Sequence, residues 1–231
     1  MNIIFCHPFD KDAIWLYLEL KKSKIAVELL TPEQVLMSQH WTQALDNSSE
    51  DFSLSLHNGL TLKGGQINFF FNRTQIVDAP IWRQAAERER EYVRSEMTAL
   101  LMSWLYQVQQ QCLMINPPVG HSLCGAAWSN AQWTKAAFDA GFTEASAADH
   151  SQSMDTDKVL VVGGKAITKL RSRKLVQHCI DLAQIAKSPL LEISVENNGN
   201  TFIGATALPT FRNHGRKFLA LIYHQLSWKN P

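Results

Sequence analysis

Short apolar runs and longer amphipathic stretches alternate along the first half of this chain. The run IIFC at residues 3–6 precedes a stretch at 12–22 in which leucine, isoleucine and aromatic residues recur, and IAVELL at 25–30 is a second apolar run. Short apolar runs are typical of buried strands, and longer periodic stretches are typical of helices. The order strand, helix, strand favours parallel strands joined by a right-handed crossover.

The next segments continue this pattern up to residue 116. SLSLHNGLTLK at 53–63 alternates apolar and polar residues around Asn-Gly, which predicts a hairpin with a type I′ turn. INFFFNRT at 67–74 is too apolar for a strand with one face in water. A helix is predicted at 81–111, with a charged first half and an apolar second half, and LMIN at 113–116 predicts the next parallel strand.

The second half of the chain reads as hairpins with helices. VLVVGGKAIT predicts a hairpin that turns at Gly163-Gly164, and LLEISVE with TFIGATA predicts another. Three helices are expected: one capped by Ser129 and running to 140, one capped by Ser172 and running to about 186, and one at about 215–226.

These patterns predict an α/β fold in two parts. Residues 1–118 form an α/β domain around a parallel sheet, and residues 119–231 form a smaller α+β domain. The stretch at 143–157 is polar and rich in small residues, so we expect a loop or linker there.

Composition and charge exclude several classes of partner. The 231 residues carry a formal charge of +1, which gives no electrostatic footprint for nucleic acid. No apolar run reaches the roughly 20 residues that span a bilayer, and the first residues do not resemble a signal peptide. The four cysteines are scattered without a CxxC pair, which argues against disulfides and zinc and favours a cytoplasmic protein.

Local motifs for catalysis or metal binding are weak. Gly163-Gly164-Lys165 lacks the leading glycine and the Ser or Thr of a phosphate-binding loop, so a hairpin tip is the better interpretation. His121 and Cys124 in GHSLCG have a spacing that suits metal ligands or a Cys–His catalytic pair. A zinc site needs further protein ligands, however, so no metal and no catalytic residue is predicted.

The order of the elements resembles the RimK-like branch of the ATP-grasp ligases, in particular the branch that ligates or cyclises ribosomal peptides. The resemblance runs from about residue 67 to 142, through INFFFNRT, SEMTALLMSWLYQ, LMINPP and SNAQWTKAAFDAGF. It resumes from about residue 158 to the C-terminus, through VLVVGGKAI, LVQHCIDLA and LLEISVENNGNTFIGATALPTF. The resemblance implies a pre-ATP-grasp-like first domain and a reduced ATP-grasp-like second domain.

Two departures from that family suggest a degenerate, truncated relative. Set against the family pattern, the Glu that holds Mg²⁺ falls on Gly204, and the Asn falls on Thr206. Neither residue supplies the carboxylate or amide oxygen that Mg²⁺ needs. The family also has a long insert that clamps the nucleotide, which is reduced here to residues 143–157. We therefore expect no cofactor and no metal, and the chain leans towards a non-enzyme.

Candidate ligand-binding residues lie at the ends of predicted elements. Asn72, Arg73 and Asn116 end neighbouring strands, and ligands of open α/β sheets sit beyond the carboxyl ends of the strands. Arg73 would bind an acidic group of a peptide or, alternatively, would neutralise an acidic residue of the long helix (Glu87, Glu89 or Glu91). The resemblance adds the basic segment TFRNHGRK, and the candidates outside the strands are His121, Arg212 and His214.

Three functions are compatible with these observations. The leading hypothesis is a non-catalytic ATP-grasp-like protein that binds a peptide or a partner protein, as an accessory or recognition subunit in peptide or protein modification. The alternative is a ligase-derived enzyme of altered chemistry that uses the inherited cleft. A homodimer is the third possibility, with the apolar half of the 81–111 helix as its interface.

Overall fold

The computed structural model describes residues 1–45, 50–77, 86–145, 156–196 and 201–227. These residues form two compact units, Met1–Pro118 and Val119–Ser227. Each unit has its own sheet and its own buried core. None of the helices in the described ranges is both long enough and apolar enough to cross a bilayer.

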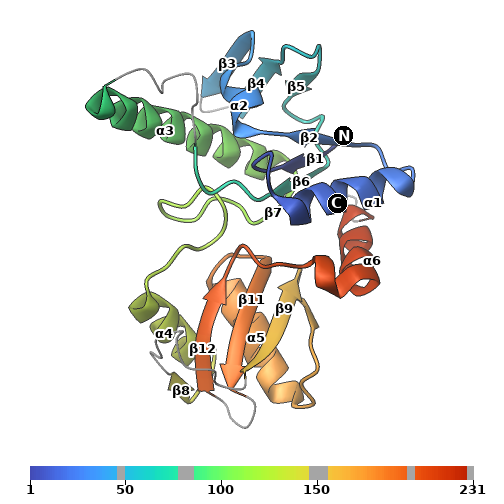
Figure 1. The fold of residues 1–231 in the computed structure, drawn as a ribbon, viewed down its shortest axis with the longest axis vertical. Helices are drawn as coiled ribbons and strands as arrows, with labels where there is room; N and C mark the ends of the chain where they lie inside the picture. The colour runs from blue at the N-terminus through green and yellow to red at the C-terminus, as the bar shows by residue number, and fades with distance from the viewer. Residues whose placement is uncertain (46–49, 78–85, 146–155, 197–200, 228–231) are drawn as a thin grey trace. The chain divides into compact units, whose positions relative to one another are not determined.

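The first unit is built on a parallel sheet in the strand order β2-β1-β6-β7 (Figure 1). Its strands are β1 (Asn2–Phe5), β2 (Val27–Leu30), β6 (Phe69–Asn72) and β7 (Leu113–Ile115). All pairings are parallel, as the sequence predicts. Every residue of β6 is buried, because a parallel sheet is covered on both faces and leaves neither side for polar residues.

Three helices accompany this sheet. Helix α1 (Lys11–Lys22) packs against β2, and its first turn is capped by the side chain of Asp10. Helix α2 (Pro32–Leu36) starts with a capping box at Thr31. Helix α3 (Glu87–Gln111) contacts β4 and β7. The sequence predicts its start at 81, but residues 81–85 lie outside the described ranges.

The two halves of α3 have different environments, as the sequence predicts. Its first turns are exposed, whereas Leu101, Trp104, Leu105 and Val108 are buried. The indole of Trp104 lies 5.5 Å from the ring of Phe5, with further edge contacts to Trp41, Phe52 and Phe70. The buried residues of the apolar half therefore belong to the core of this unit, and the dimer interface expected on this helix stays a prediction.

A three-stranded antiparallel sheet completes the first unit, with strands β3 (His40–Leu45), β4 (Glu50–Ser55) and β5 (Thr61–Lys63). The sequence predicts the β4–β5 hairpin but not β3. The type I′ turn is also wrong, because Leu56 N donates to Leu60 O at 2.8 Å and closes a loop of three residues, in which Gly59 N donates to Leu56 O at 3.0 Å. Gly59 takes φ +84°, and Asn58 acts through its side chain, whose Oδ1 accepts from Leu60 N at 3.0 Å.

The second unit is built on a five-stranded sheet in the order β10-β9-β11-β12-β8. Its strands are β8 (Glu144–Ala145), β9 (Thr156–Val162), β10 (Lys165–Ile167), β11 (Leu190–Glu196) and β12 (Thr201–Thr206). The β9–β10 and β11–β12 hairpins confirm the sequence prediction. The predicted loop or linker at 143–157 is wrong at both ends, since β8 lies inside it and β9 begins inside it, and residues 146–155 lie outside the described ranges.

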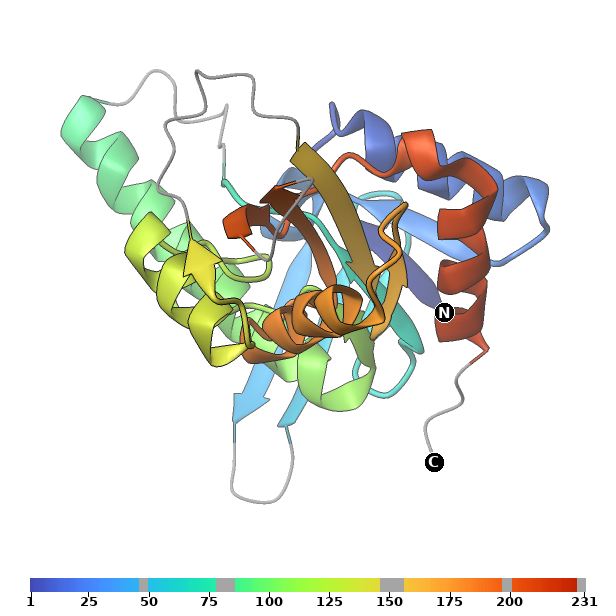
Figure 2. The ribbon, with the colours of Figure 1, turned by 90° about the horizontal axis from the view of Figure 1, so that it is seen from below.

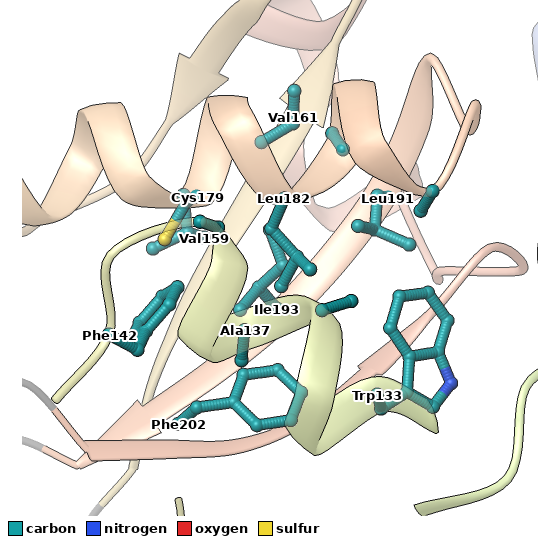
Figure 3. Close-up of a cluster of buried hydrophobic side chains, with 14 of the residues drawn as sticks. Trp133, Ala137, Phe142, Val159, Val161, Cys179, Leu182, Leu191, Ile193 and Phe202 are labelled. Carbon is teal, nitrogen blue, oxygen red and sulfur yellow. The ribbon is translucent and has the colours of Figure 1, made fainter. Parts of the chain in front are cut away.

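Helices α4 (Asn130–Asp139) and α5 (Arg173–Ile185) pack on this sheet and on each other (Figure 2). Both have the serine caps that the sequence predicts, Ser129 and Ser172. Figure 3 shows their side chains in one apolar cluster with the sheet. The cluster includes Trp133, Ala137, Cys179 and Leu182 from the helices and Val159, Val161, Leu191, Ile193 and Phe202 from the strands.

A short 3-10 helix (Arg212–His214) leads directly into α6 (Gly215–Leu226), which contacts β9 and β10. The turn between those strands is formed by Gly163 at φ +54° and Gly164 at φ +78°. A type I′ turn requires two consecutive residues with positive φ, so the predicted Gly-Gly turn is confirmed. The turn lies against α6, because a Cβ atom at Gly163 would be 2.1 Å from Gln225 Nε2.

Candidate functional site

The carboxyl edge of the parallel sheet brings three of the predicted residues together. Phe5 of β1 is level with Asn72 of β6, and the Arg73 amide donates to Phe5 O at 2.8 Å. Asn72 Nδ2 donates to the carbonyl oxygen of Asn116 at 3.0 Å. Parallel neighbouring strands end at the same edge, which is why residues distant in sequence meet here.

Arg73 is bound to Asp10, the N-cap residue of α1. Its Nε donates to Asp10 Oδ2 at 2.6 Å, and only 8% of Arg73 is exposed. The other oxygen of the same carboxylate caps α1 by accepting from Asp12 N at 3.1 Å and Ala13 N at 2.9 Å. A buried strand therefore ends on an arginine because a charge-assisted bond ties it to the next helix.

This carboxylate was not among those that the sequence analysis considered. Glu87, Glu89 and Glu91 all lie in the exposed first turns of α3. Asp10 was overlooked because it has no pattern of its own, as a single polar residue after a strand. Its position before a helix was nevertheless a signal, since aspartate is a preferred N-cap.

Asn72 and Asn116 are fully buried at this edge. Asn72 Oδ1 accepts from Thr74 N at 3.1 Å, which turns the chain away from the sheet after β6. Asn116 takes φ +53°, a left-handed conformation that asparagine tolerates better than most residues. The hydrogen bonds described above join residues of this polar cluster to each other, and they fasten β1, β6, β7 and α1 together.

His121 and Cys124 are in different environments. His121 is exposed in the tight turn between Val119 and Ser122, whereas Cys124 is fully buried. Burial raises the pKa of each of Cys6, Cys112 and Cys179 to about 12. Such thiols remain protonated and are poor nucleophiles and metal ligands. Within the described ranges, no group of His, Cys, Asp and Glu has the arrangement of a metal site.

The second unit contains a pocket of about 480 Å³ at the start of α6, which we call the basic pocket. This volume lies within the range of roughly 300–1,000 Å³ that is usual for small-ligand sites. Its charged and titratable lining residues are Lys158, Lys169, Arg216, Lys217, His214 and Asp157. His214 is the one predicted site residue among its lining residues, while Arg212 is exposed in the preceding 3-10 helix.

The sequence analysis missed the lysines of the basic pocket. Lys158 lies near the start of β9, and Lys169 follows the last residue of β10 by two positions. Once the Gly-Gly turn is assigned, the sequence places both lysines at the open end of the hairpin. The contribution of α6 could not be found in the same way, because it depends on how that helix packs on the hairpin.

The two positions on which the family resemblance would set metal ligands, Gly204 and Thr206, lie in β12. Gly204 is paired with Ser194, and Thr206 is paired with Glu192 across the β11–β12 ladder. The Glu192 carboxylate accepts from Lys158 Nζ at 2.7 Å and is almost completely buried. The cross-strand neighbour of Thr206 is thus a carboxylate that already has a cationic partner.

No family model and no curated protein matches this chain. Solved structures do match it. The macrocyclase MdnC of Microcystis aeruginosa MRC, bound with the precursor peptide MdnA, has a TM-score of 0.70 and 8% identity, covering 98% of this chain and 99% of that chain.

Two further solved structures are similar. A Chryseobacterium gregarium RiPP-associated ATP-grasp ligase, in complex with ADP and a leader and core peptide, has a TM-score of 0.66 and 10% identity over 96% of this chain and 94% of that chain. The ATP-grasp ligase PsnB, complexed with a phosphomimetic variant of its minimal precursor, Mg and ADP, has a TM-score of 0.73 and 12% identity over 97% and 98%. Together with the parallel sheet and the mixed α/β architecture, these similarities show that the chain has an ATP-grasp-like fold.

Proposed function

We propose that this protein is a non-catalytic relative of the ATP-grasp ligases that binds a peptide or a partner protein. In this role it acts as an accessory or recognition subunit in peptide modification. The solved structures with the same fold are ligases in complex with precursor peptides, which supports a peptide as the partner. The fold alone does not carry chemistry, so the proposal depends on the residues present at the site.

The observation that carries the proposal is the composition of β12 and its neighbour. ATP-grasp catalysis requires Mg²⁺ to bridge phosphate oxygens, and Mg²⁺ is held by carboxylate and amide oxygens. Gly204 has no side-chain oxygen, and Thr206 has only a hydroxyl. Glu192, opposite Thr206, has its carboxylate engaged by Lys158. These three residues therefore offer Mg²⁺ neither an amide oxygen nor a carboxylate without a cationic partner.

Calorimetric titration of the purified protein tests this proposal. We expect no heat of binding for ATP, with or without Mg²⁺, and micromolar binding of a cognate peptide. A matched control is the variant Glu192→Gln, which removes the remaining carboxylate and should leave the response to ATP unchanged. Mg²⁺-dependent binding of ATP that is lost in Glu192→Gln would contradict the proposal and would favour the ligase-derived enzyme.

A further inference from the structure

The cations of the basic pocket lie at positions where their charges are locally unfavourable. Lys158, near the start of β9, and Lys169, just beyond the end of β10, both line the pocket, where like charges repel each other. Arg216 and Lys217 lie in the first turn of α6, which contains no acidic residue. Cations are unfavourable there, because the helix dipole places its positive end at the N-terminus.

The surrounding residues offset little of this positive charge. Among the lining residues, Asp157 is the one carboxylate, and Lys158 has Glu192 as its partner. For Lys169, Arg216 and Lys217, the described residues provide no ion pair. Local preferences are most often violated at functional sites, where a ligand compensates for the cost. A bound anion would relieve the repulsion from all sides of the pocket.

We propose that the basic pocket binds an oxyanionic group, a carboxylate or a phosphate, carried by a ligand larger than a simple ion. The volume of about 480 Å³ accommodates a ligand fragment around that group. Lys169, Arg216 and Lys217 are donors to the oxyanion, and the backbone N–H groups at the start of α6 add to the favourable potential. Where the ligand is a peptide, the inference rests on the function proposed above.

The first test measures the repulsion between the cations of the basic pocket. The double variant Lys169→Gln/Arg216→Gln should have a higher melting temperature than the unmodified protein at low salt without phosphate, because two repelling charges are removed. The same variant should gain less stability from added phosphate. Lys174→Gln is the control, since Lys174 is exposed in the first turn of α5 and does not line the pocket.

Inorganic phosphate at constant ionic strength is the first probe. Phosphate also stabilises proteins in general, because it is excluded from their surfaces, so the readout is the difference between proteins. The unmodified protein and Lys174→Gln should show the same increase in melting temperature, and the double variant a clearly smaller one. An equal increase in all three proteins, or a double variant that is less stable without phosphate, would overturn the proposal.

A short peptide of consecutive glutamates and its glutamine counterpart are the second probes, in calorimetric titrations. If the pocket takes carboxylates, the glutamate peptide should bind, phosphate should compete with it, and the double variant should bind it about tenfold more weakly. If only phosphate acts through the pocket, the source of the oxyanion is a phosphorylated ligand.

Equal binding of a cognate peptide to the double variant and to the unmodified protein would refute the proposed pocket but keep the proposed function. A specific phosphate effect without binding of any peptide would keep the pocket and refute that function.

Discussion

Arg73 and Asp10 connect strand and helix at the level of single side chains. Their side chains are 6% and 14% exposed, so each charge depends on the other. A buried charge that loses its partner is strongly destabilising, while an exposed ion pair contributes little. The pair is therefore expected to stabilise the first unit rather than to remain available for a ligand.

A double-mutant cycle tests this expectation. Arg73→Met should lower the local free energy of unfolding by about 2–4 kcal/mol, because it leaves the Asp10 carboxylate without its partner. Asp10→Asn keeps a good N-cap for α1 but removes the negative charge to which Arg73 Nε donates, so it should cost a similar amount. The double variant should cost less than the sum of the two. Hydrogen exchange of α1 and β6 measures these effects.

The exposed pair of Lys22 and Glu19 is the matched control for this cycle. Its Nζ–Oε1 distance is also 2.6 Å, but Lys22 is 70% exposed. Lys22→Met should change the stability by no more than about 0.5 kcal/mol. An equal loss in Lys22→Met and Arg73→Met would mean that burial does not determine the strength of these pairs.

The buried cysteines predict a pH dependence. Burial raises the pKa of Cys6, Cys112 and Cys179 from an ordinary value of 9.0 to about 12. The unfolded chain thus loses these protons first as the pH rises. Their contribution to stability is complete below pH 9 and is lost progressively between pH 9 and pH 12, by up to about 1.4 kcal/mol per pH unit for each thiol.

Unfolding free energies measured across this alkaline range check the prediction. Cys179→Ala should have a smaller slope than the unmodified protein, whatever its absolute stability. Alkylation followed by mass spectrometry provides an independent measurement, since the thiols should react quickly only after denaturation. Rapid labelling of Cys179 in the native protein at neutral pH would contradict the assigned burial.

At the scale of elements, the β9–β10 turn shows how one hairpin positions a helix. Gly163 and Gly164 both have positive φ, but only Gly163 lies against α6, at Gln225. At Gly164 an added Cβ atom would meet open space. A substitution at Gly164 therefore tests backbone strain alone. A substitution at Gly163 also tests packing against α6, the helix that lines the basic pocket.

Alanine substitutions at the two glycines should have different costs. Gly164→Ala should destabilise the second unit by about 1 kcal/mol, from the left-handed conformation alone. Gly163→Ala adds a steric conflict with the end of the Gln225 side chain, which has to shift, so we expect a larger loss of about 1–2 kcal/mol. Thermal unfolding gives the stability. The increase in melting temperature that phosphate causes in Gly163→Ala then reports on the position of α6. An increase equal to that of the unmodified protein would show that the helix is not displaced.

At the scale of the whole molecule, the two units have separate cores. Trp104 is surrounded by aromatic rings in the first unit, and the apolar cluster of Figure 3 fills the second. Because hydrophobic packing acts over contact distances, a defect in one core should affect mainly its own unit.

Hydrogen exchange tests this separation. Trp104→Leu should reduce the protection of β1, β6 and α3 by about 2–4 kcal/mol, owing to lost packing around the aromatic cluster. Protection of β9, β11 and α5 should remain unchanged. Leu182→Ala, in the second core, is the reciprocal control and should have the opposite distribution. Loss of protection in both units from either substitution would show that they unfold as one cooperative body.

The sequence by itself determined the elements whose signals lie within a few residues. The Ser129 and Ser172 caps, the Gly163-Gly164 turn and the buried run FFF are set by local hydrogen bonding, backbone conformation and hydrophobic periodicity. The order of strands and helices was sufficient for the parallel sheet, because crossover connections have few topologies. It also brought Asn72, Arg73 and Asn116 to one edge.

Only the tertiary structure decided what those residues contact. Asp10 and Arg73 are 63 residues apart, and nothing local to either one specifies the other. Strand β3 has a weak pattern of its own and is held by pairing with β4. The basic pocket likewise combines the β9–β10 hairpin with the start of α6. Such contacts depend on how distant segments pack, and packing free energies arise from the whole core rather than from a local stretch of sequence.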